Sequence, residues 1–587
     1  MAFYVDIVNS ALIVAVLGFS LNFLIGYTGL ISLAQGAMYG VGAYATAIVA
    51  TRAGLDLPLT VVLSVAVTAV GYTLIAWPAL RVTGEYLILL TLAVQFVLVG
   101  VYTSWTSVTG GSGGIAGIPR PTWLTGSEFP SPTDLLPFVL VIFFIGLGLS
   151  LWIGHSPFGR TLRAVRENES AAVSIGKNVT YYKVMVFLLA GVLAGLAGAA
   201  YAHYLAFVSP VSFSLDQSIF LIAVIVLGGA GNIFGTVLGS FILVGFPQLL
   251  LLLELDNQVA GLAQRFAYGL LLVLFMIYRP QGLVPEYLHI PLRRVAPARR
   301  RRDVVAGTRR SRNPGPPTGD GDGDHPVVVA TELCKSFGGV RPADGLSLSL
   351  PRGKITALVG PNGAGKTTVF NLLTGVTSLD AGRVELHGRD VTDLAAWQRT
   401  GLGLARTFQD VRIFGGIRVI DNVTTAIPDQ PGDRVSSLFG RPWATWRTSV
   451  DTTEKALSYL DFVGLADRAG ALASTLAFAE QKLLGLARLM ATEADVLLLD
   501  EPASGVDRQW VDKILELVRE LASDGRTVCI VEHNLEIVRA LASHAYFMDA
   551  GKIVADGTPD ELMADPHLAS IYFGRSGPPT EDTHAGD

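Results

Sequence analysis

Long apolar runs recur through the first 290 residues of the 587-residue chain and then stop. A helix needs about 20 mostly apolar residues to cross the hydrocarbon core of a bilayer. The runs lie near 8–25, 30–51, 57–79, 86–103, 135–154, 184–207, 217–253 and 264–278. This pattern predicts an all-α polytopic membrane domain over residues 1–290, with about eight to ten crossings.

The first apolar run has the length of a secretory signal peptide as well as that of a membrane helix. However, no basic residue precedes it, no small-residue cleavage site follows it, and the chain returns at once to apolar sequence. We therefore interpret it as a membrane segment.

Basic residues in the loops predict the orientation, because cytoplasmic loops carry an excess of Lys and Arg. We place loop 155–183 in the cytoplasm and loop 104–134, with Arg120 as its one basic residue, outside. The run 217–253 is broken at 227–232 and predicts two short helices or a re-entrant hairpin. The side on which the N-terminus lies stays open. The basic residues of loop 155–183 are Arg160, Arg163, Arg166, Lys177 and Lys183.

Four polar side chains interrupt the apolar runs: Asn22, Gln35, Gln95 and His203. Intramembrane polar residues can mark a substrate path. Neutral polar groups also form hydrogen bonds between helices. The sequence leaves both roles open for these four residues.

Composition separates the two halves of the chain. Residues 1–290 contain 10 Lys+Arg and 11 Asp+Glu, about 7% of that half, whereas residues 291–587 contain 34 and 38, close to the soluble norm of about 25%. This excludes a purely soluble enzyme, a disordered protein and a disulfide scaffold. Both halves are weakly acidic, so we expect no nucleic acid partner. Cys334 and Cys529 lie in apolar, strand-like runs and predict buried free thiols in a reducing compartment.

Residues 291–325 predict a linker. Nine arginines and one acid, Asp303, lie between Arg293 and Arg312, and a stretch rich in Gly, Pro and Asp follows. Such a sequence cannot bury a core, so we expect a flexible tether whose basic part contacts anionic lipid headgroups. We expect a folded domain over 326–575 and a flexible tail over 576–587.

The clearest motif is a phosphate-binding loop. A short apolar strand over 354–360 leads into a glycine-rich loop and then into a helix with apolar residues on one face. The glycines let backbone N–H groups converge on phosphates, and the helix N-terminus adds partial positive charge. We expect Lys366 to reach the β- and γ-phosphates of ATP and the Thr367 hydroxyl to ligate Mg²⁺. The loop consists of Gly360, Pro361, Asn362, Gly363, Ala364, Gly365, Lys366, Thr367 and Thr368.

Two further apolar strands end in polar residues. The run 495–499 is followed by Asp500 and Glu501, and the run 527–531 is followed by Glu532 and His533. Strands that are apolar throughout are typical of a parallel sheet buried on both faces. We expect Asp500 to hold Mg²⁺, Glu501 to polarise the attacking water and His533 to contact the γ-phosphate.

With these motifs in order, residues 326–575 resemble the α/β P-loop ATPase of an ABC transporter. The resemblance implies that Gln409 is the Q-loop residue with a metal-binding and catalytic role, that Phe337 stacks on adenine, and that 504–507 is the D-loop. The run 406–414 further resembles the ATPase subunits of branched-chain amino acid importers.

One element departs from the family pattern. The family's signature, usually written LSGGQ, contacts the ATP bound by a partner ATPase. The serine hydroxyl is missing here, so the composite site built with this signature is expected to be weakened. The aligned residues are Leu476, Ala477, Phe478, Ala479 and Glu480.

The membrane half resembles the permease of the same importers. The matching stretches are 26–37, 40–44, 80–86, 105–111, 114–119, 159–168 and 227–232. Loop 159–178 lies where the family has its cytoplasmic coupling helix; the alternative is an ordinary positive-inside loop.

Together the resemblances imply a permease fused to its ATPase in a multi-pass protein of the bacterial cytoplasmic membrane, with the ATPase on the cytoplasmic side. The implied function is ATP-driven import of branched-chain or related amino acids. The implied partners are a second permease, a second ATPase, an extracytoplasmic solute-binding protein and membrane lipid. An exporter, an importer of urea or short amides, and a membrane-anchored ATPase acting as a sensor or regulator remain alternatives.

Overall fold

The structure is a computed structural model. It describes residues 2–82, 84–120, 131–251, most of 266–287, 326–440 and 442–568. The linker 291–325, the tail 576–587 and about half of the run 264–278 lie outside these residues, so the expectations for them stay predictions. Internal contacts divide the chain into two units. The first comprises Met1–Arg166, Val179–Ile290 and Gly432–Gly440, and the second Glu167–Asn178, Pro291–Pro431 and Arg441–Asp587.

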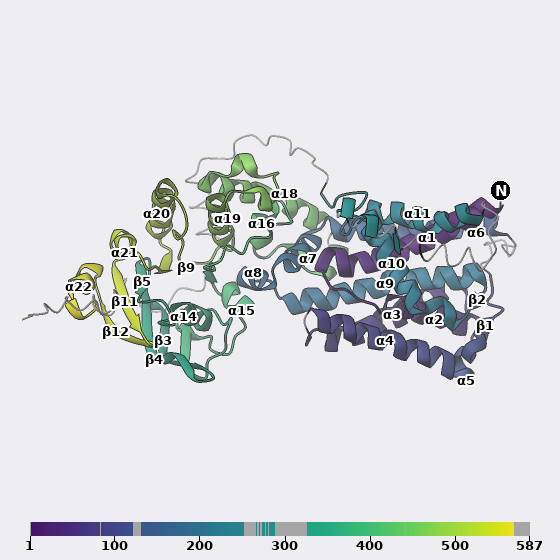
Figure 1. The fold of residues 1–587 in the computed structure, drawn as a ribbon, viewed down its shortest axis with the longest axis horizontal. Coiled ribbons are helices and arrows are strands. Elements are labelled where there is room, and N and C mark those ends of the chain that lie inside the picture. Colours follow the sequence, from purple (N-terminus) through teal and green to yellow (C-terminus); the bar gives the residue numbers. More distant parts are fainter. Residues whose placement is uncertain are drawn as a thin grey trace, which may run out of the picture. The chain divides into compact units, whose positions relative to one another are not determined.

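The first unit is a bundle of apolar helices (Figure 1). Among the described residues, five spans are long and apolar enough to cross a membrane: Phe3–Tyr27, Leu57–Ala79, Glu85–Ser104, Thr133–Gly154 and Val179–Leu205. The main helices are α1 (Ala2–Asn22), α2 (Gln35–Arg52), α3 (Leu57–Ala79), α4 (Glu85–Ser104), α6 (Pro132–Gly154), α9 (Val179–Leu205), α10 (Leu215–Gly228) and α11 (Ile233–Leu251).

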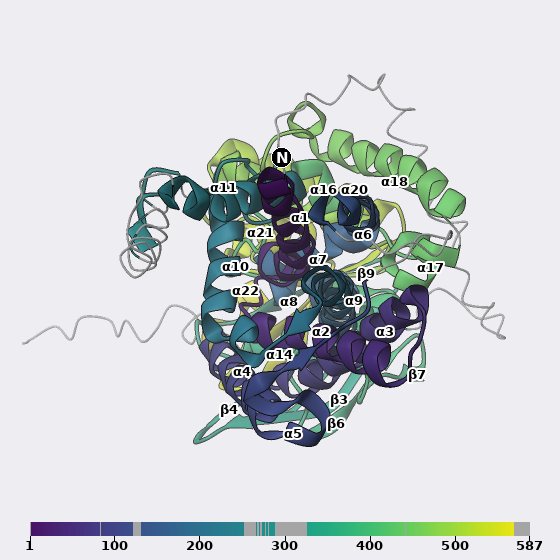
Figure 2. The ribbon, with the colours of Figure 1, turned by 90° about the vertical axis from the view of Figure 1, so that its right-hand side faces the viewer.

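Helix α9 is the centre of this bundle. It contacts α1, α2, α3 and α6, and Figure 2, which looks along the helices, shows it among them. The contact is close because α9 carries glycines: a Cβ added at Gly191, Gly195 or Gly198 would lie 2.6–2.7 Å from backbone atoms of α3 or α2. Small residues let membrane helices approach this closely. Close packing matters in a membrane, because lipid supplies no hydrophobic force that would drive the helices together.

The predicted break in the run 217–253 is confirmed, because α10 ends at Gly228 and α11 begins at Ile233. Helix α1 continues into a π-helical turn, η1 (Phe23–Tyr27). Two short helices, α7 (Pro157–Glu167) and α8 (Glu169–Ser174), follow α6.

Short elements connect the long helices elsewhere in the first unit. They are α5 (Thr106–Thr109), η2 (Gly111–Gly113), η3 (Pro210–Phe213) and the antiparallel pair β1 (Ile115–Ala116) and β2 (Phe207–Val208).

The four polar residues inside the apolar runs all connect one element to another by hydrogen bonds. In each case the partner lies on a different helix or loop, as expected for interhelical bonding. The pairs are Asn22 with Asn232 and Thr236, Gln35 with Ser20 and Tyr72, Gln95 with Ala37 and Phe213, and His203 with Thr60 and Pro119.

A short segment from the ATP-binding half of the sequence belongs to the first unit. It contains α17 (Val435–Gly440), whose Leu438 is 1% exposed within the helical core. The backbone N–H of Val435 donates to the hydroxyl of Tyr181, with 3.1 Å between the atoms. Contacts in the fold therefore cross the domain boundaries that the sequence predicts.

The second unit contains two sheets (Figure 1). The larger has the strand order β12–β11–β5–β10–β9–β8, with β12 antiparallel and the other five parallel. Its strands are β5 (Ile355–Val359), β8 (Leu404–Arg406), β9 (Val496–Asp500), β10 (Thr527–Val531), β11 (His544–Asp549) and β12 (Lys552–Gly557). Every residue of β5, β9 and β10 is buried, as their continuous apolar sequence predicts.

The smaller sheet is antiparallel, in the order β4–β3–β6–β7. Its strands are β3 (Pro326–Phe337), β4 (Val340–Pro351), β6 (Ala381–Leu386) and β7 (Arg389–Asp390).

Helices connect most strands of the second unit, and one follows the last strand. They are α14 (Lys366–Leu373), α15 (Ala396–Gly401), α16 (Val419–Ala426), α18 (Pro442–Val463), α19 (Phe478–Ala491), α20 (Arg508–Ser523), α21 (Leu535–Leu541) and α22 (Pro559–Ala564).

One predicted thiol is not buried. Cys529 on β10 is buried, but Cys334 on β3 is only partly buried. The pairing of β3 with β6 shifts register between Thr331 and Cys334, which interrupts the alternation of side chains along the strand. Leu333, 0% exposed, therefore takes the core position beside it.

Candidate nucleotide-binding site

The phosphate loop follows β5 and can be built only with glycine at its two ends. Gly360 has a φ of +153° and Gly365 a φ of +105°. A Cβ at Gly360 would lie 2.0 Å from the Met548 carbonyl oxygen, and a Cβ at Gly365 would lie 2.1 Å from that of Pro342. The loop therefore turns tightly into α14, whose N-terminal amides are available to an anion.

Lys366, the first residue of α14, folds back over this loop. Its Nζ donates to the carbonyl oxygens of Gly360, at 2.7 Å, and Pro361, at 2.9 Å. Burial lowers the pKa of Lys366, and the nearby carboxylates of Glu501 and Asp500 oppose that shift. An ammonium group is thus held over the phosphate loop by main-chain carbonyl oxygens, where it can exchange these bonds for bonds to a phosphate.

Asp500, at the end of β9, is a buried carboxylate. It is 2% exposed, and neither oxygen has a hydrogen-bond partner among the described residues. Arg406 Nη2 lies 3.5 Å from Asp500 Oδ2. Burial raises the pKa of Asp500 to about 6, against the lowering effect of Arg406. A buried carboxylate so loosely paired beside the phosphate loop suits a hard divalent cation.

Glu501 and His533 come together from two neighbouring strands. Because β9 and β10 pair in parallel, their carboxyl ends meet at one edge of the sheet, and His533 Nδ1 lies 3.9 Å from Glu501 Oε1. Glu501 has a φ of +47°, a conformation that costs an L-residue free energy. Its backbone is held there because its N–H donates to the Val531 carbonyl oxygen at 2.9 Å.

The remaining predicted nucleotide residues are more exposed. Gln409 is exposed after β8. Phe337 is 54% exposed at the end of β3, with Lys335 Nζ 5.5 Å from its ring centroid. The hairpin partner β4 reaches the phosphate loop through Pro342, beside Gly365. An exposed aromatic ring on this hairpin is free to stack on a base.

The signature residues form the start of α19. Leu476 is buried, Ala477 caps the helix, and Phe478 is 50% exposed. The backbone N–H of Ala477 donates to Glu480 Oε2 at 2.9 Å. The helix N-terminus therefore already holds a carboxylate where the family pattern would offer a serine hydroxyl and free amides.

Two residues of this site were missed from the sequence. Arg406 is the buried cation beside Asp500, and Lys482 donates from Nζ to the Glu501 carbonyl oxygen at 2.9 Å. An arginine within the otherwise apolar strand β8 was a usable signal. The sequence around Lys482 gave no such signal, because its hydrogen-bond partner is a main-chain atom of a residue distant in sequence.

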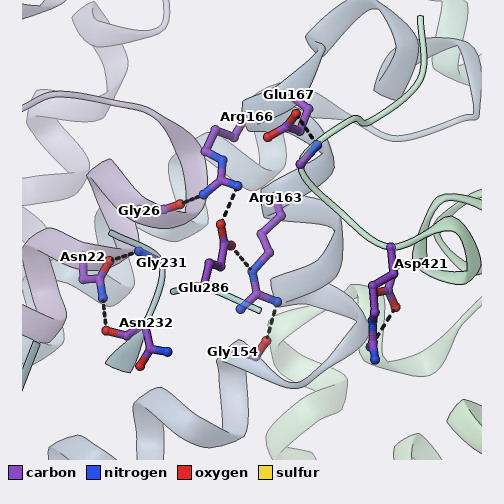
Figure 3. Close-up of polar contacts among 12 residues, drawn as sticks. Asn22, Gly26, Gly154, Arg163, Arg166, Glu167, Gly231, Asn232, Glu286 and Asp421 are labelled. Carbon is purple, nitrogen blue, oxygen red and sulfur yellow. Dashed lines mark hydrogen bonds and ion pairs between the residues drawn. The ribbon is translucent and has the colours of Figure 1, made fainter. Parts of the chain in front are cut away.

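The second unit also contains the segment Glu167–Asn178, which includes α8. Glu167 Oε2 accepts from the Gly416 N–H at 2.8 Å (Figure 3). Thr400 Oγ1 donates to the Ser174 carbonyl oxygen at 3.3 Å. Ile175 lines a cavity together with Thr407 and Phe408. Residues Glu167–Asn178, the second part of the predicted coupling loop 159–178, thus pack next to the predicted Q-loop. We call these residues the coupling segment.

Comparisons with known proteins agree with these two regions. Residues 3–278 match the family model described as "Branched-chain amino acid transport system / permease component", and residues 343–504 match the model described as "ABC transporter". The fold and the phosphate site of the second unit accordingly define an ABC-type ATPase.

Similar proteins indicate which kind of ABC transporter this chain resembles. The chain is 34% identical over 252 residues to the high-affinity branched-chain amino acid transport ATP-binding protein LivG of Salmonella typhimurium, covering 43% of this chain and 99% of that protein. It is 33% identical over 253 residues to BraF of Pseudomonas aeruginosa, with the same coverage. A solved nucleotide-free ATP-binding cassette from an ABC transporter is 31% identical, with a TM-score of 0.38, covering 43% of this chain and 100% of that chain.

The chain belongs to the branched-chain amino acid ABC transporter family, with a permease region and an ATP-binding region in one polypeptide. It is a membrane protein that binds nucleotide and hydrolyses ATP in a reaction coupled to transport.

Proposed function

We propose that this protein is the fused permease and ATPase of an importer for branched-chain or related amino acids. The observation that carries coupling is the packing of Glu167–Asn178, which the sequence assigns to the permease loop, against Gly416 and Thr400 of the ATPase unit. The names of the relatives, which are high-affinity branched-chain amino acid transport proteins, support the substrate class. The complete machine includes a second permease, a second ATPase and an extracytoplasmic solute-binding protein.

The orientation follows from the same segment. Loop 155–183 is rich in Lys and Arg, which favours the cytoplasmic face, and its central part packs on the ATPase. We place the ATPase in the cytoplasm, where ATP is available.

Mg²⁺ fits the nucleotide site. The buried carboxylate of Asp500 and the Thr367 hydroxyl would hold it, with Gln409 as the third predicted ligand. When bound, the metal neutralises phosphate charge. Lys366 binds the phosphates, and the phosphate loop orients them through its backbone amides. Glu501 accepts the proton of the attacking water, and His533 holds the γ-phosphate end of the site.

Uptake into membrane vesicles tests this function. Vesicles that contain the assembled transporter and internal ATP should accumulate labelled leucine only when the solute-binding protein is present outside. Labelled urea and a short amide, added in parallel, separate the substrate classes. Efflux from preloaded vesicles without a binding protein would instead indicate an exporter, and ATP hydrolysis with no solute movement would indicate a sensor.

A further inference from the structure

A short segment, which we call the strap, is hydrogen-bonded to the turn between α10 and α11. This strap, residues 281–287, follows the last apolar run. The N–H groups of Leu283 and Val284 donate to the carbonyl oxygens of Leu227 and Gly228 at 2.9 and 3.0 Å. Asn232 Nδ2 donates to the Pro285 carbonyl oxygen at 2.8 Å. The strap is thus fixed to both ends of the turn.

Glu286 of this strap lies between two arginines of α7 (Figure 3). Its Oε1 is 2.8 Å from Arg163 Nε, and its Oε2 is 2.8 Å from Arg166 Nη2. The three side chains are 13–19% exposed. Exposed ion pairs contribute little free energy, but a largely buried carboxylate between two guanidinium groups matters more, because removing it leaves like charges together out of water.

The same two arginines also contact the turn η1 that follows α1. Arg166 Nη1 donates to the Gly26 carbonyl oxygen in the π-helical turn η1. Arg163 lies over the ring of Tyr27, with 4.4 Å from Cζ to the centroid. Arg163 Nη1 also donates to the Gly154 carbonyl oxygen, at 3.3 Å, at the end of α6.

Asn22, the last residue of α1, forms hydrogen bonds to the α10–α11 turn. Its Oδ1 accepts from the Gly231 N–H at 2.8 Å, and its Nδ2 donates to the Asn232 carbonyl oxygen at 3.1 Å (Figure 3). No space remains between the turn and the strap, because a Cβ at Gly231 would lie 2.6 Å from Glu286 Cδ. The end of α1, the α10–α11 turn, the strap and α7 therefore form one hydrogen-bonded assembly around Glu286.

We propose that Glu286 is a positioning residue for coupled transport. It fixes α7 to the end of α1 and to the α10–α11 turn, so that a displacement of the segment after Arg166 moves these helices together. The next residue, Glu167, begins the segment that packs on the ATPase. This proposal rests on the proposed function, since it requires that nucleotide binding be coupled to a solute path.

The test compares Glu286→Gln with two controls in the assembled transporter. Glu286→Asp keeps the charge, and Asp560→Asn removes a distant ion pair with Arg539 whose side chains are 64% and 70% exposed. Glu286→Gln should leave basal ATP hydrolysis within about twofold and lower uptake roughly 3- to 30-fold, the range for residues along a coupling network. Glu286→Asp should recover part of the uptake, and Asp560→Asn should match the wild type.

A second readout needs no substrate. In a background of Cys334→Ser and Cys529→Ala, Leu283→Cys places a thiol on the strap at a side chain that is 36% exposed. ATP with vanadate should change its rate of maleimide labelling, and Glu286→Gln should abolish that change at equal protein content in the membrane. Unaltered uptake and an unaltered labelling response in Glu286→Gln would overturn the proposal. If the wild type takes up no branched-chain amino acid, the proposed function fails, while the labelling still decides the role of Glu286.

Discussion

Two regions of the molecule hold charged groups away from water. One is the phosphate edge, formed by Lys366, Asp500 and their neighbours, and the other is the cluster around Glu286. They differ in how closely each charge is paired. At the phosphate edge, Asp500 has a long ion pair, with Arg406 Nη2 at 3.5 Å from its Oδ2, and Lys366 donates to the main-chain carbonyl oxygens of Gly360 and Pro361. Around Glu286, each carboxylate oxygen has an arginine at 2.8 Å. A buried charge whose partner is distant suits a ligand site, because a bound ligand offsets the cost of its burial, whereas a closely paired charge suits a mechanical connection.

The largest expected effect is at the reacting group of the phosphate edge. Glu501→Gln should retain ATP binding and lower turnover by about 10²–10⁴-fold, the range for a general base. The measurements are ATP affinity by filter binding and steady-state hydrolysis. Turnover within a few-fold of the wild type would remove Glu501 from this role.

Lys366 should decide nucleotide affinity. Lys366→Ala removes the cation over the phosphate loop, so ATP binding and transport should fall together, by about tenfold or more for a charge-assisted hydrogen bond. A fluorescent nucleotide titration measures the affinity. Lys354→Ala, also in the ATP-binding half but outside the phosphate loop, is the matched control and should bind as the wild type does. Unchanged affinity in Lys366→Ala would contradict the assignment.

These two regions also differ in how far the sequence predicts them. The phosphate edge follows from local order: an apolar strand, glycines and a helix within 354–373, a strand that ends in Asp500, and a parallel strand that is followed by His533. The break at 227–232 follows likewise, from its glycines. Local sequence carries these features because each is a backbone requirement.

The Glu286 cluster could not be predicted, because its partners are 120 and more residues apart and one glutamate after an apolar run has no periodic signal. The same holds for the packing of Gly432–Gly440 in the first unit and for the register shift that leaves Cys334 partly exposed. These features depend on which surfaces meet, which a single sequence does not show.

A smaller effect is expected where the coupling segment meets the ATPase. Glu167→Ala removes the acceptor for the Gly416 N–H, so transport per ATP hydrolysed should fall by a few-fold, about 1 kcal/mol for one hydrogen bond. Ser170→Ala, an exposed neighbour on α8, is the control and should leave the ratio unchanged. An equal ratio in both variants would exclude this contact from coupling.

The smallest effect on this chain alone is expected at the signature. We predict that the two ATP sites of the assembled transporter are unequal and that the weaker one contains this chain's signature. Ala477 lacks a hydroxyl, and the carboxylate of Glu480 already accepts the hydrogen bond from the Ala477 N–H, so a phosphate would meet a negative charge there. The lost charge-assisted hydrogen bond corresponds to roughly 1.5–3 kcal/mol of binding at that site.

Ala477→Ser should nevertheless change turnover only modestly, because hydrolysis would already proceed at the site formed by this chain's own phosphate loop and the partner's signature. Glu501→Gln on this chain should then be severe, and the equivalent change on the partner ATPase milder. Mass measurement of the purified complex establishes whether the pair is a heterodimer, and the two variants measured in it decide the asymmetry. If the chain pairs with itself, both sites contain Ala477 and Glu480, and turnover should be slow throughout and rise with Ala477→Ser. Equal losses from either variant in a heterodimer would show that Glu480 at the helix N-terminus does not weaken its site, because both sites would then contribute alike.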